Sequence, residues 1–427
     1  MLFTATAFNY ADRAILSVAA PSLSKELTLD PVAMGYIFSA FSWAYVLAQI
    51  PGGWLLDRFG SKKTYAFSII LWSVFTGLEG GIMVFGAACA MPLLFLLRFL
   101  VGLSEAPSFP ANGRIVAAWF PTAERGTASA IFNSAQYLAV VLFTPLMAWI
   151  TETRGWRPVF VVMGSIGVFL GIVWLKVVYS PRQHPRLQRA EFDHIAGGGG
   201  LVDMDQPKSA SPSRSRVGWS KIKQLLSNRM LLGVYLGQYC INTITYFFLT
   251  WFPVYLVQER GMSILKAGFV ASLPAICGFI GGVLGGVLSD GLMKRGVSLT
   301  RARKIPIVTG LILSTSMVLC TVVEGQALVV AIMALAFFGK GLGALGWAVI
   351  SDTSPKELIG LTGSIFNMFG SIAGITAPIV IGYILKSTGS FNVALFYVGA
   401  NALVAVISYL WIVQKIQRVE LSPVVAS

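Results

Sequence analysis

The chain has 427 residues, of which 56% are hydrophobic and only 12% are charged, and its mean hydropathy is +0.74. Water-soluble domains carry about 25% charged residues, so this composition excludes a soluble fold. The formal net charge of +14 would point to nucleic acid in a soluble protein, so the position of the charges decides what it means here.

Apolar runs of about 20 residues recur along the whole chain, and each can cross a hydrocarbon core of roughly 30 Å as a helix. Alternating segments of about ten residues, typical of an outer-membrane barrel, are absent. The sequence therefore predicts an all-α polytopic membrane protein. In chain order, the twelve expected transmembrane helices cover residues 2–22, 33–56, 65–85, 90–111, 127–150, 158–179, 230–257, 267–289, 305–323, 327–350, 361–385 and 391–413.

The basic residues gather in alternate loops. These are the loops at 57–64, 112–126, 180–229, 290–304 and 352–360, together with the C-terminus. They carry almost the whole net charge, whereas the opposite set of loops is close to neutral. By the positive-inside rule we expect the basic set, and both termini, on the cytoplasmic side. Membrane topology thus explains the net positive charge, and the expected partner is a lipid bilayer rather than a nucleic acid.

The segment 180–229 is the one long polar stretch, with four glycines from Gly197 and the Ser/Pro/Arg-rich SASPSRSR. We expect an unstructured or partly helical cytoplasmic linker there. It would separate an N-terminal half of six helices, residues 1–179, from a C-terminal half of six helices, residues 230–427.

The two halves repeat each other at an offset of 233 to 234 residues. The matched positions are Gly53 with Gly286, Asp57 with Asp290, Pro121 with Pro355, Gly126 with Gly360, the IFN of 131–133 with that of 365–367, and Pro145 with Pro378. Two parallel repeats with a substrate site between them near the membrane midplane are similar to the arrangement of major facilitator transporters.

The loop between the second and third helices carries GGWLLDRFGSKK, Gly52–Lys63, and resembles the superfamily signature G-x-x-x-D-R-x-G-x-K/R-K/R. GGVLSDGLMKRG, from Gly285, echoes it. In that superfamily the aspartate, here Asp57 or Asp290, faces a helix N-terminus, where the dipole favours an anion. The resemblance implies a gating role for both aspartates and for Arg58. Solvated loop charges that only orient the protein are the alternative.

Five charged residues fall well inside expected spans, away from the span ends, and each costs roughly 2.5–3.5 kcal/mol at the bilayer centre. They are Asp12, Arg13, Arg98, Glu105 and Lys340. Arg98 and Glu105 are seven residues apart, so both can face one cavity from the same side of their helix. The structural alternative is neutralisation in two packing pairs, one of Asp12 with Arg13 and one of Arg98 with Glu105. Lys340 has no acid nearby in its own helix.

Six longer segments resemble the anion:cation symporter family, and within it the glucarate and galactarate transporters. They are NYADRAILSVA (Asn9–Ala19), MGYIFSAFSWAYVLAQIPGGW (Met34–Trp54), RFLVGLSEAPSFPANGRIVAAWFP (Arg98–Pro121), IFNSAQY (Ile131–Tyr137), GQYCINTITYFFLTWFPVYL (Gly237–Leu256) and ALAFFGKGLGALGWAVISDTSPKE (Ala334–Glu357). The similarity covers essentially the whole chain. That family couples proton entry to the uptake of organic anions, chiefly sugar acids.

The resemblance implies a substrate site lined by Tyr10, Arg13, Tyr45, Gln136, Trp347 and Asn367. It also implies that Asp12 and Glu105 carry protons, with Arg98 beside them. A guanidinium can bind a carboxylate through two N–H groups, and Tyr, Gln and Asn supply neutral donors and acceptors for a polyol. Helix-packing aromatics and interhelical hydrogen bonds are the alternatives for these side chains.

A diacid has a carboxylate at each end, and Arg13 can hold only one of them. The repeat places Lys340 beside the counterpart of Glu105, so we expect Lys340 to hold the second carboxylate from the opposite half. A structural pair with an acid of a neighbouring helix is the alternative. For proton transfer, burial favours the neutral acid while a nearby arginine favours the ionised one, so Asp12 and Glu105 are balanced between two opposing influences. Glu79 is expected near an outer helix end.

We therefore expect a proton-coupled importer of dianionic sugar acids, glucarate first and galactarate second, working as a monomer in a bacterial-type inner membrane. A transporter of the same fold for monoanionic sugar acids, hexuronates or aromatic acids is the alternative. A channel is disfavoured because selectivity filters repeat around a symmetry axis. A sensor without net transport is a third class. Compared with the family, the first helix begins late at Met1, and a misassigned start codon would explain it.

No enzyme is predicted, because the sequence has no phosphate-binding GxxxxGK[ST] and no metal-ligand cluster. Both histidines, His184 and His194, lie in the central linker. The four cysteines fall inside spans without CxxC spacing, which predicts neither a disulfide nor a zinc site. We expect no cofactor, with protons as the coupling ion.

Overall fold

The computed structural model describes residues 1–121, 124–205, 219–355 and 358–420. Within these residues the secondary structure is helical, and no β-strand is present. The chain divides into two units. Unit 1 consists of Met1–Ser211 and Ser263–Phe269, and unit 2 consists of Pro212–Met262 and Val270–Ser427.

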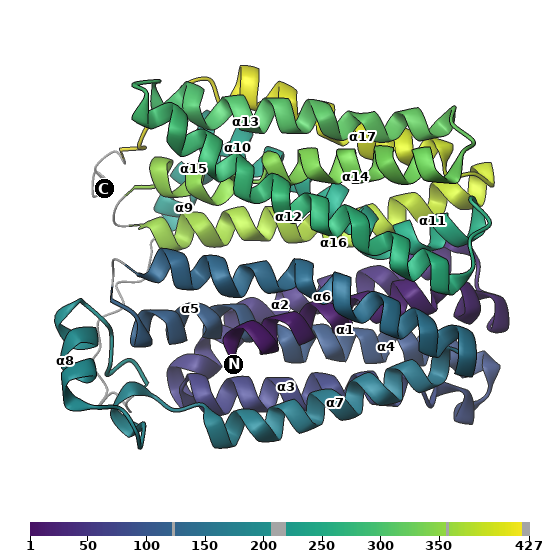
Figure 1. Ribbon diagram of the computed structural model, residues 1–427, viewed down its shortest axis with the longest axis horizontal. Coiled ribbons are helices and arrows are strands. Elements are labelled where there is room, and N and C mark those ends of the chain that lie inside the picture. The colour runs from purple at the N-terminus through teal and green to yellow at the C-terminus, as the bar shows by residue number, and fades with distance from the viewer. Residues whose placement is uncertain (122–123, 206–218, 356–357, 421–427) are drawn as a thin grey trace. The chain divides into compact units, whose positions relative to one another are not determined.

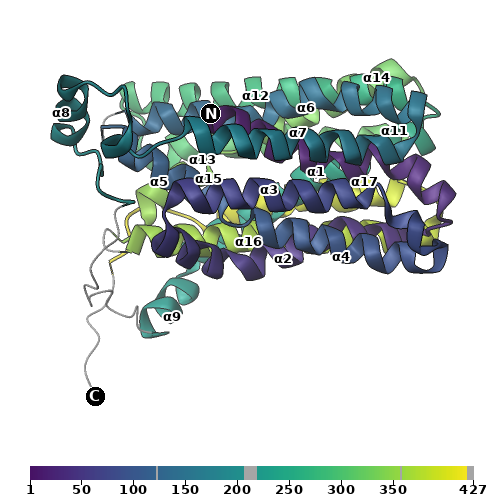
Figure 2. The ribbon, with the colours of Figure 1, turned by 90° about the horizontal axis from the view of Figure 1, so that it is seen from below.

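Unit 1 is a bundle of long helices, drawn in purple to teal in Figure 1. They are α1 (Leu2–Glu26), α2 (Pro31–Phe59), α3 (Ser61–Glu79), α4 (Ala87–Glu105), α5 (Ser108–Trp119), α6 (Arg125–Arg154) and α7 (Trp156–Val177), with the short α8 (Arg189–Gly197) after them. A 3-10 turn, η1 (Ile82–Phe85), joins α3 to α4, and another, η2 (Pro181–Gln183), follows α7. Two views agree that α3 lies alongside α7 (Figures 1 and 2).

Unit 2 repeats the bundle plan with more interrupted helices. They are α9 (Trp219–Ser227), α10 (Arg229–Tyr246), α11 (Phe252–Gln258), α12 (Ile264–Lys294), α13 (Leu299–Ser314), α14 (Gln326–Leu342), α15 (Gly346–Thr353), α16 (Ile359–Thr388) and α17 (Asn392–Ile407). Short π-helical stretches continue α10 at η3 (Phe247–Trp251) and α17 at η6 (Ser408–Ile412), while 3-10 turns at η4 (Thr315–Thr321) continue α13. The first residues of α12 group with unit 1.

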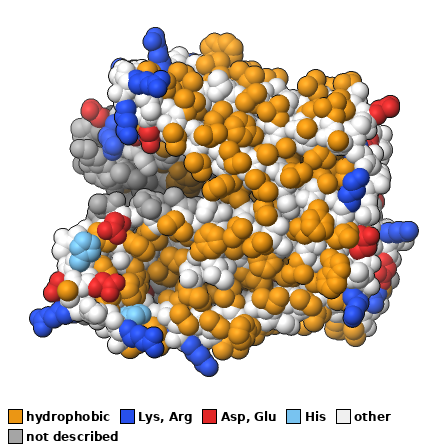
Figure 3. Space-filling model, in the orientation of Figure 1, with side chains coloured by type: hydrophobic (Ala, Val, Ile, Leu, Met, Phe, Trp, Pro, Cys, Tyr) orange, Lys and Arg blue, Asp and Glu red, His pale blue; other side chains and the backbone are white. Residues whose placement is uncertain are grey.

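Ten helical stretches of the described chain are long and apolar enough to cross a membrane. The helices α1 and α3 complete the twelve expected spans. Both fall short of that criterion because α1 carries Asp12 and Arg13, and α3 carries Lys62, Lys63 and Glu79 near its ends. In the face shown in Figure 3, hydrophobic side chains cover the middle of the helices and charged side chains gather toward their ends. The protein is therefore an all-α polytopic membrane protein, as the sequence predicts.

The fourth span departs from the predicted boundaries. The sequence predicts that this span ends at residue 111, but α4 ends at Glu105 and α5 then continues to Trp119. The helix is interrupted between α4 and α5, at Ala106 and Pro107, because proline has no N–H to continue the hydrogen bonding of α4. A large part of the expected loop 112–126 is thus helical, and Glu105 is the last residue before the break.

The expected linker contains ordered helices in its described parts. Beyond α8, Leu201 N donates to the carbonyl oxygen of Ala117 (2.8 Å). Asp205 accepts hydrogen bonds from the backbone N–H (3.1 Å) and the hydroxyl (2.9 Å) of Ser61, at the first turn of α3. Arg114 of α5 donates to the same carboxylate (3.3 Å). These hydrogen bonds hold the residues up to Asp205 within unit 1. The Asp205 carboxylate also meets a favourable dipole, because it lies at the N-terminus of α3.

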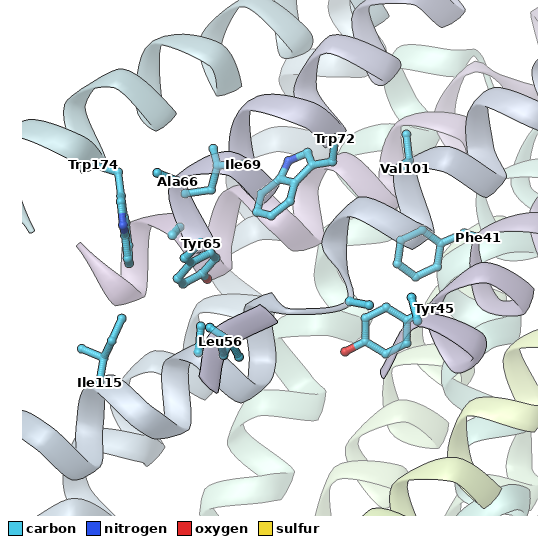
Figure 4. Close-up of a cluster of buried hydrophobic side chains, with 14 residues drawn as sticks. Phe41, Tyr45, Leu56, Tyr65, Ala66, Ile69, Trp72, Val101, Ile115 and Trp174 are labelled. Carbon is cyan, nitrogen blue, oxygen red and sulfur yellow. The ribbon is translucent and has the colours of Figure 1, made fainter. Parts of the chain in front are cut away.

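Aromatic rings form the core of unit 1 beside α3 (Figure 4). The ring of Tyr65 lies 4.4 Å from that of Trp174 and 6.4 Å from that of Trp72, centroid to centroid. The indole N–H of Trp174 donates to the carbonyl oxygen of Lys62 (3.2 Å). All three rings are fully buried, so this cluster fixes α3 against α7.

Close approach of α3 and α7 depends on glycine. A Cβ at Gly164 would lie 2.6 Å from the carbonyl oxygen of Ser73 and 2.7 Å from the backbone of Gly77. Both distances are far below van der Waals contact, so only glycine fits without moving a backbone. Small residues at helix crossings are the usual means of close packing in membranes, where no hydrophobic force drives the helices together.

Gly164→Ala is expected to lower the stability of the folded protein by about 1–3 kcal/mol, because the extra methyl must displace backbone atoms. Gly113→Ala is the matched control, since a Cβ at Gly113 meets nothing within 4 Å. Thermal unfolding in detergent, followed by size-exclusion chromatography, measures both. Equal unfolding temperatures for the two variants would contradict this account of the α3 and α7 contact.

Candidate substrate and coupling site

The most prominent polar contact inside unit 1 joins α1 to α4. Arg13 Nε donates to Oε1 of Glu105 (2.7 Å), and a second guanidinium nitrogen contacts the same oxygen. The Arg13 side chain is 10% exposed and that of Glu105 is fully buried. Charge-assisted contacts of this kind are stronger than hydrogen bonds between neutral groups. A substrate carboxylate could take the place of Glu105 and make the same contact with Arg13.

Three aromatic rings surround the Arg13 guanidinium. Its central carbon lies 4.9 Å from the ring centroid of Tyr10, 4.7 Å from that of Phe41 and 5.1 Å from that of Tyr45. Phe41 and Tyr45 stack on each other and are labelled together in Figure 4. Cation–π attraction holds the guanidinium in this cage. The structure thus brings together Tyr10, Arg13 and Tyr45, three of the predicted substrate residues.

The other predicted residue of unit 1, Gln136, is half-buried on α6. That helix packs along α1, the helix that carries Arg13. A nearby hydrogen bond satisfies two further polar groups, from Asn112 Nδ2 to the hydroxyl of Thr6 (3.1 Å). Neutral donors and acceptors therefore accompany the charged pair in the buried part of unit 1.

The second arginine has a partner that the sequence did not predict. Arg98 forms an ion pair with Glu79 of α3 (Nη2 to Oε2, 2.8 Å), and both side chains are buried. Arg98 Nη1 also donates to the backbone carbonyl oxygen of Asp12 (3.4 Å). The carboxylate of Asp12 accepts a hydrogen bond from the hydroxyl of Thr76 (2.8 Å). Asp12, Arg98 and Glu79 form one buried cluster.

Neither of the two packing pairs considered as the structural alternative forms among the described residues. Arg13 pairs with Glu105 instead of its neighbour Asp12, and Arg98 pairs with Glu79 instead of Glu105. Adjacent residues on a helix point in different directions, and residues seven apart are separated by two turns, so partners on other helices are closer. The sequence predicts Glu79 near an outer helix end, but it does not predict that this side chain is buried. An acid at the margin of an apolar run was the only signal for it.

Unit 2 holds the remaining predicted substrate residues. Lys340 is 7% exposed and has its ammonium 5.1 Å from the ring centroid of Phe337, and no described carboxylate forms an ion pair with it. Trp347 is 54% exposed and meets Phe366 edge to face at 5.0 Å. Asn367 follows on α16 and is half-buried. Lys340 is thus a buried cation without an acid among the described residues of its unit.

Two amides of α10 add to the polar groups of unit 2. Gln238 Nε2 donates to Oδ1 of Asn242 (3.3 Å). A Cβ at Gly346 would lie 3.0 Å from the side-chain oxygen of Gln238, and one at Gly370 would lie 2.5 Å from the amide nitrogen of Asn242. The amides therefore lie against α15 and α16, close to Trp347. Neither amide was predicted as a site residue, although their position in the segment GQYCIN, inside an apolar span, is a signal that could have identified them.

The predicted gating residues are only partly described. The side chain of Asp57 lies outside the part of the chain that the structure describes. Arg58 is exposed, with its guanidinium 5.2 Å from the ring centroid of Trp54. In the second motif, Asp290 is exposed and meets Arg303 of α13 at 3.4 Å, while Arg303 lies closer to Asp352 (2.8 Å). Asp290 is thus in an ion-pair network.

Among the described residues, no group of three or more His, Cys, Asp and Glu side chains could hold a metal ion. The described cysteines are free thiols. The chemistry that the buried residues offer is ion pairing and hydrogen bonding.

The chain matches the Major Facilitator Superfamily model over residues 2–301 and belongs to that superfamily. It is 64% identical to the probable galactarate/D-glucarate transporter GudP of Bacillus subtilis (strain 168), over 99% of this chain and 92% of that one. It is 61% identical to the protein of the same name from Escherichia coli (strain K12), over 99% and 94%. A D-galactonate transporter of Escherichia coli O6:H1 is 42% identical, over 98% and 95%. These relatives are named as transporters, not as enzymes.

Solved structures agree on the fold. A bacterial homologue of the human lysosomal transporter Spinster, in an inward-facing conformation, superposes with a TM-score of 0.70 at 17% identity, over 96% of this chain and 93% of that one. A D-xylose-proton symporter gives the same TM-score at 15% identity, over 97% and 96%. At these identities the likeness concerns the fold alone, which is the twelve-helix fold of the superfamily in two six-helix halves.

Proposed function

We propose that this protein is a proton-coupled symporter that imports dianionic sugar acids, glucarate and galactarate, by alternating access. The observation that carries the proposal is the Arg13 guanidinium, which is caged by aromatic rings and held by the carboxylate of Glu105. Relatives more than 60% identical over nearly the whole chain, named for galactarate and D-glucarate, support the choice of substrate.

Proton coupling follows from the exchange of one anion for another at Arg13. A buried guanidinium without a counter-charge is costly, so Arg13 keeps Glu105 until another carboxylate is available. Protonation of Glu105 removes its charge and frees Arg13 to bind a substrate carboxylate. When the substrate leaves, Arg13 recaptures Glu105 and the proton is released. Glu105 and Asp12 are the proposed proton carriers.

The second substrate carboxylate requires a second cation, and unit 2 supplies Lys340. Its burial without a described acid favours a role in anion binding over a structural ion pair. The polyol part of the substrate would form hydrogen bonds through its hydroxyl groups and pack through its carbon atoms. The residues proposed for these contacts are Tyr10, Tyr45 and Gln136 of unit 1 and Trp347 and Asn367 of unit 2. The hydroxyl groups of a sugar acid need such neutral donors and acceptors.

The remaining roles are proposed from the sequence. Asp57, Arg58 and Asp290 would stabilise one conformer at the loop motifs rather than touch the substrate. Basic loops on one side support an inner, or plasma, membrane location with both termini in the cytoplasm. We propose a monomer that uses no cofactor besides the coupling proton.

A second candidate substrate class is the monoanionic sugar acids. The 42% identical relative named as a D-galactonate transporter favours it, since galactonate carries a single carboxylate. The two candidates differ in whether Lys340 has a substrate charge to bind. A diacid gives it one and a monoacid does not.

Uptake by proteoliposomes tests the proposed function. Radiolabelled glucarate, galactarate, galactonate and a hexuronate are offered with and without an inward proton gradient. Accumulation of both diacids above equilibrium, only with the gradient, is the expected result. Accumulation that ignores the gradient, or that favours the monoacids, would contradict it.

Glu105→Gln mimics the protonated acid and leaves Arg13 without its counter-ion. The variant is expected to exchange internal for external glucarate but to lose accumulation under an inward proton gradient. The control is Glu324→Gln, which removes an exposed carboxylate of unit 2. Full gradient-driven accumulation by Glu105→Gln, at normal expression, would show that the coupling residue lies elsewhere.

Lys340→Asn is expected to weaken glucarate transport by about tenfold or more, because a hydrogen bond to a charged group contributes about 1.5–3 kcal/mol. Transport of galactonate, which has one carboxylate, should fall much less. Lys386→Asn is the control, since Lys386 is exposed on α16. Concentration dependence of uptake for each acid gives the comparison, and equal losses for both acids would refute the assignment.

A further inference from the structure

Glu79 is the one acid of the buried charge cluster that has no role in the proposed transport cycle. Glu79 is the last residue of α3, a place where an acid is normally solvated, yet its exposed fraction is zero. The following Gly80 explains the burial. A Cβ at Gly80 would lie 2.7 Å from the carbonyl oxygen of Arg157 on α7, so the chain packs tightly there and excludes water.

Arg98 lies between two acids. It forms an ion pair with Glu79 at 2.8 Å, and it donates to the backbone carbonyl of Asp12. Thr76, which holds the Asp12 carboxylate, is three residues before Glu79 on α3, so the two acids approach Arg98 from neighbouring points. The charge of Arg98 acts on both carboxylates.

The charge balance of this region is uneven. Among the described residues of unit 1, three acids are fully buried, Asp12, Glu79 and Glu105, whereas the arginines beside them are two, the buried Arg98 and Arg13, whose side chain is 10% exposed. The arginines are taken by Glu105 and Glu79, and the described residues give Asp12 no ion pair of its own. A buried charge without a partner is costly, so a cluster with one surplus acid is neutral only when it binds one proton.

Every charged group near Asp12 belongs to this set. Arg98 approaches it from α4, Arg13 lies beside it on α1, and the carboxylates of Glu79 and Glu105 act on it from α3 and α4. The helices α2, α6 and α7, which also pack on α1, contribute no ion pair to Asp12 among the described residues. The proton balance at Asp12 therefore depends on which acid Arg98 holds.

We propose that Glu79 is a positioning residue for proton coupling: it is the fixed counter-ion of Arg98, and by occupying Arg98 it leaves Asp12 free to bind and release the transported proton. This inference rests on the proton-coupled function proposed above. It assigns Glu79 no contact with the substrate. Glu79 affects proton binding at Asp12 only indirectly, by pairing with Arg98.

Glu79→Gln tests the proposal in reconstituted full-length protein. With Glu79 neutral, Asp12 becomes the only acid left for Arg98, and the two arginines and two remaining acids are balanced without a proton. Gradient-driven accumulation of glucarate should therefore fall by about tenfold or more, the size of one lost charge-assisted contact. Counterflow exchange, which needs no net proton movement, should continue. Glu26→Gln, which breaks an exposed ion pair with Arg157 in the same unit, should keep full accumulation.

The double variant Glu79→Gln/Arg98→Gln separates positioning from structural support. It removes both partners of one ion pair, keeps Arg13 with Glu105, and leaves Asp12 as the surplus acid, as in the unmodified protein, so accumulation should recover above the Glu79→Gln level. It also serves if Glu79→Gln alone fails to fold, in which case the double variant should fold and accumulate glucarate. Full accumulation by Glu79→Gln, or a folded double variant that exchanges but does not accumulate, would overturn the proposal.

Asp12→Asn distinguishes failure of this inference from failure of the proposed function. Loss of accumulation in Asp12→Asn together with full accumulation in Glu79→Gln would refute the role of Glu79 and leave proton coupling at Asp12 intact. Full accumulation in Asp12→Asn would refute the roles of both Asp12 and Glu79, because Glu79 acts only through Asp12, and would leave proton coupling to Glu105.

Discussion

Charge buried in a hydrocarbon layer must be neutralised, and the pair of Arg13 with Glu105 meets that constraint in a way that also permits transport. A guanidinium at this depth is costly unless an anion accompanies it. In the proposed cycle Glu105 is the resting anion, and a substrate carboxylate is a chemical equivalent of it. The rings of Tyr10, Phe41 and Tyr45 hold the guanidinium in place while its partner changes. In the proposed cycle, substrate binding and proton coupling thus both follow from this one interaction.

Features that depend on local sequence were predicted well. Hydropathy alone located the spans, because a helix that crosses a bilayer must be apolar over about 20 residues. It also located α1 despite Asp12 and Arg13, since the rest of that helix is apolar. Tyr10 and Arg13 share a helix face by their spacing of three residues, and the structure has both at one cage. The family match confirms the resemblance seen in the motifs.

Features that depend on contacts between helices could not be predicted. Spacing along α4 suggested Arg98 as the partner of Glu105, but the partner came from α1 because helix packing brought Arg13 nearer. Glu79 resembled a solvated helix end, and its burial arises from the close approach of α7 at Gly80. The extension of the fourth span to Trp119 reflects a break at Pro107 that hydropathy does not detect.

Proton uptake on substrate binding tests the central claim most directly. Purified protein in weakly buffered detergent solution is mixed with glucarate at matched pH, and a pH indicator follows the solution while calorimetry confirms binding. If a substrate carboxylate replaces Glu105 at Arg13, binding must draw protons from solution onto the displaced acid, and the solution becomes more alkaline. Glucarate that binds with no change in proton content would contradict the exchange of anions at Arg13.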